Sequence, residues 1–153
     1  MSEKIEKLNK LDDNDFLIIE ALKKDSKLSE QKIAKKTGIP MTTVHNRIKK
    51  LREKGIIEFF TIRINYKKIG KPIVAYVHVK IIHGADQKKM LDEIAKIPEV
   101  SEVAMVTGEY DLIFKARVAS MEELQEIVIK HLRKEKNVGE TMTMIAYETL
   151  EKP

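Results

Sequence analysis

The chain has 153 residues, of which 42% are hydrophobic and 35% charged, with a formal net charge of +5. This length suits one ordinary domain or two small ones, and the composition is that of a folded soluble protein rather than a disordered one. The sequence contains no Cys, which excludes disulfides, zinc ribbons and thiol catalysis and favours a reducing compartment; the absence of Trp argues against a base-stacking surface for single strands.

The excess positive charge lies in the N-terminal part of the chain. Residues 67–153 contain equal numbers of acidic and basic side chains, so residues 1–66 account for the whole excess. A localised basic surface attracts polyanions, and this favours a nucleic-acid partner. We expect no membrane partner, because the basic segment lacks an apolar companion face and no run resembles a signal peptide or a membrane span. The expected location is cytoplasmic.

The first predicted helix occupies "LDDNDFLIIEALKKDS", residues 11–26. Asp12 or Asp13 is a suitable N-cap, with further acid in the first turn. The apolar residues Phe16, Ile19 and Leu22 are spaced as one face of a helix, which we expect to be buried.

The second and third predicted helices form a pair joined by a short turn. In "LSEQKIAKKTG", Ser29 is the expected N-cap, and Gly38 supplies the positive φ that ends the helix. Pro40 suits the first turn of the next helix, which should run to about Lys54 and end at Gly55. The spacing of Ala34, Gly38 and Val44 is that of a helix-turn-helix, in which the second helix packs one face and leaves the other free.

The free face of the third helix is polar and basic. Thr42, Thr43, His45 and Asn46 are predicted to reach base edges, because amide, hydroxyl and imidazole groups can pair with them in the major groove. Phosphate contacts are predicted for lysines and one arginine: Lys49, Lys50, Arg52 and Lys54, with Lys35 and Lys36 on the preceding helix. Arg47 lies near the edge of the buried stripe and is interpreted as a packed arginine reaching a carboxylate or a phosphate. Each of these residues has the alternative of being an ordinary solvated side chain.

After Gly55 the pattern changes to β-branched and aromatic residues. "IIEFFTIRINY", residues 56–66, predicts a short hairpin that either packs or acts as a wing with Arg63 on the DNA backbone. The next residues, "KKIGKP" (67–72), combine Gly, Pro and charge without periodicity and are the predicted linker. The predicted domains are therefore a DNA-binding domain, 1–66, and a second domain, 73–153.

The second half reads as strand, helix, strand, strand, helix, strand. The strands are predicted at 73–82, 100–106, 110–118 and about 139–150, and the helices at 86–97 and 120–134, where Ser120 and Glu123 form a capping box. This order is the ferredoxin-like βαββαβ plan, so the whole chain is predicted to be α+β. Such a sheet has one face without helices, and Val74, Tyr76 and His78 should point there. A half-apolar open face favours self-association, with cover by the linker or a helix of the same chain as the alternative.

Other classes of function find little support. No Ser/His/Asp grouping or phosphate site indicates an enzyme, the four His residues are scattered, and the sheet lacks the paired aromatics of an RNA-binding RRM domain. We therefore expect no catalysis, metal or cofactor.

The sequence resembles the Lrp/AsnC (leucine-responsive, feast/famine) transcription regulators. The resemblance rests on "LDDNDFLIIEALKKD", "IAKKTGIPMTTVHNRIKKLREKGII", "INYKKIG" and "VSEVAMVTGEYDLIF", which occur in the family's order. It implies a prokaryotic DNA-binding regulator whose C-terminal domain forms homodimers, and in many members tetramers or octamers, and binds a small effector such as an amino acid. The sequence departs from the family pattern at Pro40, where Ser is common, and at Arg52, where an acidic residue is common.

The resemblance also assigns an effector role to "TGEYD", residues 107–111. It matches the family's effector-binding turn at Gly108 and Asp111, where backbone N–H groups would hold a carboxylate and Asp111 an α-ammonium group. Tyr110 and Thr107 are expected neighbours, and Thr141 and Thr143 are expected to line an adjoining subunit's side. The alternative is a purely structural β-turn in which Gly108 supplies the positive φ.

Overall fold

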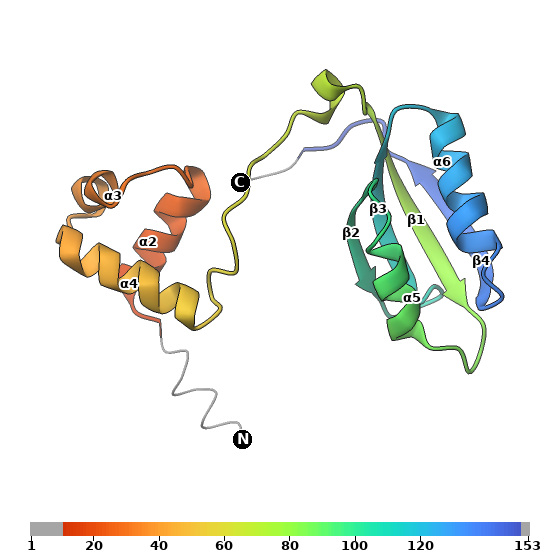
Figure 1. Cartoon of the computed structure of the whole chain (residues 1–153), viewed down its shortest axis with the longest axis horizontal. Coiled ribbons are helices and arrows are strands. Elements are labelled where there is room, and N and C mark those ends of the chain that lie inside the picture. The colour runs from red at the N-terminus through yellow and green to blue at the C-terminus, as the bar shows by residue number, and fades with distance from the viewer. Residues whose placement is uncertain (1–10, 151–153) are drawn as a thin grey trace. The chain divides into compact units, whose positions relative to one another are not determined.

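The computed structural model describes residues 11–150, which form two compact units that divide between Arg63 and Ile64 (Figure 1). The predicted domain ends at 1–10 and 151–153 lie outside the described residues. The division falls before the predicted linker, 67–72, which belongs to the second unit. There, Tyr66–Ile69 form a short 3-10 helix, η1.

The described part of the first unit contains three helices: α2 (Asp13–Lys24), α3 (Glu30–Thr37) and α4 (Met41–Glu53). Asp12 is the N-cap of α2, and its carboxylate and that of Asp15 accept each other's backbone N–H in a full capping box. Gly38 ends α3 in the left-handed region with φ of 74°, and Gly55 follows α4 with φ of 69°, as predicted. Pro40 stands just outside α4, whose N-terminus has no side-chain cap.

The core of this unit joins all three helices. It contains the following buried residues: Ile18, Leu22, Ile33, Ile39, Val44 and Leu51. The predicted inward face of α2 is wrong at Phe16, whose side chain is 54% exposed. Ile18 and Leu22, one turn apart, form the buried stripe instead, because they are the residues of α2 that meet Ile33 and Val44 in the common core.

The predicted hairpin after α4 is absent from the described chain. Residues 56–65 contain no strand; Ile56 and Ile57 pack on the helical core, whereas Phe59 and Ile62 are largely exposed. β-Branched residues stabilise a strand only where a partner strand pairs with them, and an isolated two-stranded hairpin is marginal in water. The segment has no Gly, and its one Asn, Asn65, stands at its end rather than in its middle, so no tight turn is favoured between two strands.

The second unit is built on a four-stranded antiparallel sheet in the order β2-β3-β1-β4. The strands are β1 (Ile73–Ile81), β2 (Val100–Met105), β3 (Leu112–Val118) and β4 (Val138–Ile145). The helices are α5 (Gln87–Ile94) and α6 (Met121–Ile127), the latter continued by a π-helical segment, η2 (Val128–Arg133). This is the predicted βαββαβ order.

Both helices cover the same face of the sheet, as Figure 1 shows. Alternate residues of β1, namely Ala75, Val77 and Val79, are fully buried against them, which confirms the predicted period of two. Ser120 caps α6 by accepting the N–H of Glu123, but the Glu123 carboxylate accepts from Ala119 rather than from Ser120. The predicted capping box is therefore formed only in its first half.

The other face of the sheet is covered at one end by the chain's own η1. The Arg117 guanidinium of β3 lies 4.3 Å from the centre of the Tyr66 ring, and its sheet neighbour Val74 is buried. The interpretation that the chain itself covers this face therefore holds in part, whereas self-association stays a prediction. The linker side of the chain covers the end near Val74, whereas Tyr76 and His78 remain half-exposed and Met144 exposed.

Candidate nucleic-acid interface

The turn between α3 and α4 is fixed by hydrogen bonds and by a continuous apolar core. The Thr37 hydroxyl donates to the carbonyl of Ile33 at 2.8 Å and accepts the N–H of Ile39. Val44 is fully buried and Leu51 nearly so, which presses one side of α4 into the core. The opposite side of α4 therefore faces solvent, as a recognition helix requires.

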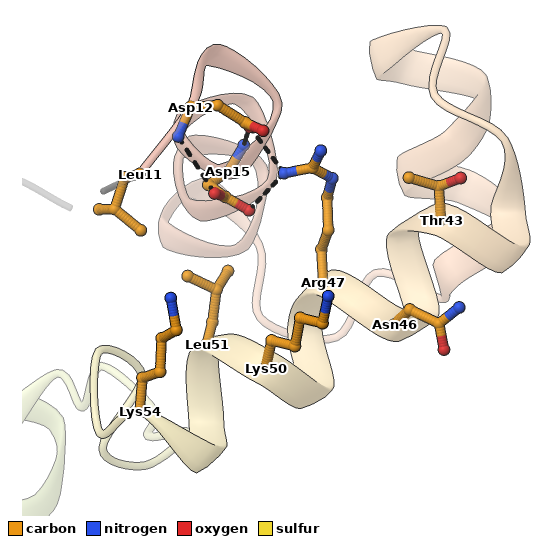
Figure 2. A pocket seen from close by; sticks show the side chains of 9 residues that line it. All are labelled: Leu11, Asp12, Asp15, Thr43, Asn46, Arg47, Lys50, Leu51 and Lys54. Atoms are coloured by element: carbon orange, nitrogen blue, oxygen red, sulfur yellow. Dashed lines mark hydrogen bonds and ion pairs between the residues drawn. The ribbon is translucent and has the colours of Figure 1, made fainter. Parts of the chain in front are cut away.

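The exposed side of α4 gathers most of the residues predicted to contact DNA. Those exposed on α4 are Thr42, His45, Asn46, Lys49, Lys50, Arg52 and Lys54, the last at its C-cap, and on α3 they are Lys35 and Lys36. Thr43 is half-buried. Figure 2 shows Asn46 and Lys50 projecting from α4 without a partner among the side chains drawn. The surface combines an amide and hydroxyls with several ammonium groups, which suits base edges together with phosphates.

Three residues of this surface already contact neighbours. The Nδ1 atom of His45 lies 2.8 Å from Oε1 of Glu30, which leaves Nε2 for another contact. The guanidinium of Arg52 lies 6.0 Å from the centre of the Phe60 ring, and Lys49 lies 3.9 Å from Glu53. These contacts are exposed and weak, so they orient the side chains without making them inaccessible to DNA.

Arg47 points away from the exposed face and toward the start of α2 (Figure 2). One of its terminal nitrogens donates to Oδ1 of Asp12 at 2.7 Å and to Oδ1 of Asp15 at 2.8 Å. These side chains line a cavity of about 380 Å³ together with Lys50 and Lys54. The structure thus agrees with the interpretation of Arg47 as a packed arginine reaching carboxylates.

The ion pair shifts the pKa values of Asp12 and Arg47. The hydrogen bond from Arg47 is the largest cause that holds the pKa of Asp12 below its ordinary value of 3.8, followed by the backbone N–H of Asp15. Hydrogen bonds to Asp12 and then to Asp15 raise the pKa of Arg47. Asp12 and Arg47 are therefore both charged at neutral pH. The sequence analysis did not assign roles to Asp15 and Glu30, because each lies far in the sequence from the residue that it pairs with.

The turn at 107–111 is open at its tip and fixed at its base. Gly108 has φ of 124°, which an L side chain rarely adopts, and Thr107 and Gly108 are exposed. The Asp111 carboxylate accepts the N–H of Ile81 at 2.7 Å and the side-chain amide of Gln87 at 2.9 Å. Asp111 therefore joins the turn to β1 and α5, whatever else it binds.

The other residues predicted for the effector site are not all brought together within one chain. The ring of Tyr110 lies edge-on to His78, with 5.3 Å between ring centres, and burial followed by Glu140 and Glu109 raises its pKa. In the sheet register, Thr141 pairs with Val79 and Thr143 with Val77, whose side chains belong to the helix-covered core. The two threonines therefore lie on the opposite face of the sheet from His78.

Neither a metal site nor a membrane span is found in the part of the chain that the structure describes. Within residues 11–150, no three His, Asp or Glu side chains are grouped as metal ligands. No helix in that range has the length and apolar character to cross a bilayer.

Comparison with known families decides the class of protein. A family model described as winged helix-turn-helix DNA-binding matches residues 11–58, and one described as Lrp/AsnC ligand binding domain matches residues 74–153. The chain belongs to the Lrp/AsnC family. It is a DNA-binding transcriptional regulator and not an enzyme.

Relatives among curated proteins agree with this assignment to the Lrp/AsnC family. An uncharacterized HTH-type transcriptional regulator of Pyrococcus furiosus is 46% identical over 142 residues, which cover 92% of this chain and 95% of the relative. The HTH-type transcriptional regulator FL11 of the same organism is 40% identical over 118 residues, or 77% of this chain and 78% of FL11.

Two solved structures share the fold over nearly the whole chain. LrpC of Bacillus subtilis superposes with a TM-score of 0.84 at 26% identity, covering 95% of this chain and 100% of LrpC. A transcriptional regulator of Neisseria meningitidis, solved as a complex with L-Met, gives a TM-score of 0.86 at 20% identity, with 93% of each chain covered. The second likeness shows the fold alone.

Proposed function

We propose that the protein regulates transcription by reading double-stranded DNA with the exposed face of α4, two or more copies acting together at pseudo-palindromic promoter sites. The observation that supports this most directly is the two-sided character of α4. Val44 and Leu51 fix the helix in a core, while Asn46 and Lys50 are left free toward solvent. As a prokaryotic regulator of transcription, it would act in the cytoplasm, where the chromosome lies.

Within this proposal the exposed residues divide by chemistry. Thr42 and Asn46 read base edges, with Thr43 and the free Nε2 of His45 at their side, since hydroxyls, amides and imidazoles discriminate bases in the major groove. Phosphates are neutralised by the cationic set Lys35, Lys36, Lys49, Lys50, Arg52 and Lys54.

We further propose that a homodimer forms through the part of the sheet face that η1 leaves open. Tyr76, His78 and Met144 give this face the mixed apolar and polar character of an interface. The Nε2 atom of His78 is buried and lacks a hydrogen-bond partner within the described residues, so a partner copy would supply one. A dimer places two copies of α4 on related half-sites.

The proposed effector is an amino acid, bound at the turn 107–111. Thr107 and Gly108 are exposed, and backbone N–H groups in such a turn suit a carboxylate. Each carboxylate oxygen of Asp111 has accepted one internal hydrogen bond and retains lone-pair capacity for an α-ammonium group. The complex of the Neisseria meningitidis regulator with L-Met supports the class of ligand, not its identity.

One experiment tests DNA binding and the effector together. The purified protein is used to select fragments from genomic DNA, with and without a pool of L-amino acids, and the bound sites are sequenced. We expect duplex sites with dyad symmetry, a binding constant that falls steeply with salt, and a change in site occupancy when the pool is present. Salt-independent retention, or equal retention of single strands, would refute the proposal for α4.

The oligomeric state is measured by light scattering on the same material. We expect a dimer or a multiple of it, such as a tetramer or an octamer, with Tyr76→Glu reducing it toward monomer because the substitution places a charge in the interface. A wild-type protein that is monomeric at micromolar concentration would refute the proposed use of the open face.

A further inference from the structure

The recognition helix α4 is joined to α2 by an ionic cluster, the clamp Asp12–Asp15–Arg47. Arg47 is 24% exposed and Asp15 14% exposed, whereas Asp12 is about half exposed. Charge-assisted hydrogen bonds of this length are stronger than neutral ones, and partial burial reduces their screening by salt. The clamp spans more than thirty positions in sequence and connects α2 with the middle of α4.

The same two carboxylates also form the N-terminal capping box of α2. Asp12 uses Oδ1 for both the N–H of Asp15 and the guanidinium, whereas Asp15 uses Oδ2 for the N–H of Asp12 and Oδ1 for the guanidinium. The capping box thereby fixes the orientation of both carboxylates. Because the two carboxylates are fixed, they hold the Arg47 side chain in one direction. This contact in turn limits the rotation of α4 about its own axis.

Rotation of α4 matters because residues next to Arg47 on this helix belong to the face that is proposed to enter the major groove of DNA. Asn46 precedes Arg47, and Figure 2 shows its amide directed away from the carboxylates that hold Arg47. Lys50 follows one turn later and lines the same cavity as Arg47. A base-reading amide has to lie within hydrogen-bond distance of its base, and a small rotation of the helix removes that contact. Phosphate contacts of flexible lysines tolerate such a rotation.

We infer that Arg47 is a positioning residue for sequence-specific DNA binding: held by Asp12 and Asp15, it sets the angle at which α4 presents its base-reading face. This inference rests on the proposed function. The alternative is that Arg47 itself contacts DNA. Asp12 and Asp15 would then weaken DNA binding, either by keeping Arg47 in the ion pair or by repelling phosphate.

The two views predict opposite signs for the same substitution. Asp15→Asn and Asp12→Asn each remove one negative charge beside the recognition helix but keep a side-chain oxygen that can accept the same backbone N–H. At the N-cap, which is Asp12, Asn and Asp are about equally favourable. If Arg47 is a positioning residue, these variants lose affinity for the selected site although the protein has become more positive. If Arg47 contacts DNA, release of Arg47 and the added charge strengthen binding.

Asp13→Asn is the matched control. Asp13 lies in the same first turn and its substitution changes the net charge equally, but no hydrogen bond or ion pair of its side chain is found among the described residues. The measurements are the dissociation constants for a selected genomic site and for an unrelated duplex, over a series of salt concentrations, at a temperature at which circular dichroism shows every variant to be folded.

We expect Asp15→Asn, Asp12→Asn and Arg47→Met each to lose about tenfold in the ratio of specific to non-specific affinity, equivalent to about 1.4 kcal/mol. Asp13→Asn should keep that ratio. The salt dependence of Arg47→Met should equal that of wild type, and the double variant Arg47→Met/Asp15→Asn should be no weaker than either single one, because all three remove the same contact.

Two results would overturn the inference. One is tighter specific binding by Asp15→Asn or Asp12→Asn; the other is a salt slope that falls by about one contact in Arg47→Met. If Asp15→Asn does not fold, Asp12→Asn decides alone, because Asp12 is the more exposed partner. A wild-type protein that retains no duplex at all refutes the proposed function instead, so the two failures are distinguishable.

Discussion

Val44→Ala tests whether α4 is held by the small core of its own unit. The Val44 side chain is fully buried, so the substitution removes two carbon atoms from contact with the helical core. At about 0.8 kcal/mol for each buried carbon, with an additional cavity term, the expected loss in the free energy of unfolding is about 2–3 kcal/mol. In a domain of this size, each kcal/mol lowers the melting temperature by roughly 4–8 °C.

The loss should be confined to the first unit, because the buried residues of the two units form separate clusters. Hydrogen exchange followed by mass spectrometry measures both units in one sample. Peptides from α2 and α4 should lose protection in Val44→Ala, whereas peptides from β1 and β3 should not change. Met41→Ala, at a site 52% exposed on the same helix, is the control and should differ little from wild type.

Two outcomes would refute this reasoning. A loss below about 0.5 kcal/mol, the range of ordinary surface substitutions, would mean that Val44 is not packed as described. Equal loss of protection in β1 would mean that the two cores do not unfold independently.

Further predictions concern the recognition face, the clamp and the turn. Asn46→Ala should cost ~1–3 kcal/mol at the preferred site and relax sequence choice, whereas Lys50→Gln should weaken all sequences alike and reduce the salt slope by about 0.9; binding to a panel of sites separates them. Because the pKa of Asp12 is lowered in the folded state, its stabilising effect is complete above the ordinary value of 3.8 and is lost as the pH falls through the lowered pKa. The melting temperatures of wild type and Asp12→Asn should therefore converge below pH 3.8, and a constant difference would contradict the ionic contribution. Gly108→Val should remove any response of DNA binding to amino acids, because a β-branched residue does not adopt φ of 124°, while DNA binding without amino acids persists.

The helix-turn-helix and the sheet were predictable because local signals and burial agree there. Gly38 marks the turn by a conformation that suits glycine, and the alternation in β1 marks which side of the strand is buried. The Lrp/AsnC resemblance that followed from these motifs was confirmed by the family comparisons.

The predictions from sequence were wrong where a local pattern did not determine which other element, if any, would pack against it. The β-branched run at 56–65 has no strand beside it within the described chain, so it remains irregular. Phe16 fits the helical period of an inward face, but the period cannot say which of two adjacent stripes meets α3 and α4. The packing of Arg47 was predicted from its position at the edge of the buried stripe. Its partners were not, because no local spacing connects it with Asp12 and Asp15.

The contact between Tyr66 and Arg117 has a consequence for engineering of the chain. Since η1 is attached to the sheet, and Lys71 is paired with Glu99 and Glu123, the residues that complete the second unit begin at Ile64 rather than at the first strand. A chimera that replaces the helix-turn-helix unit of this regulator with that of a relative should be joined just before Ile64. A junction at Ile73 would remove the Tyr66 ring, which covers the Arg117 guanidinium.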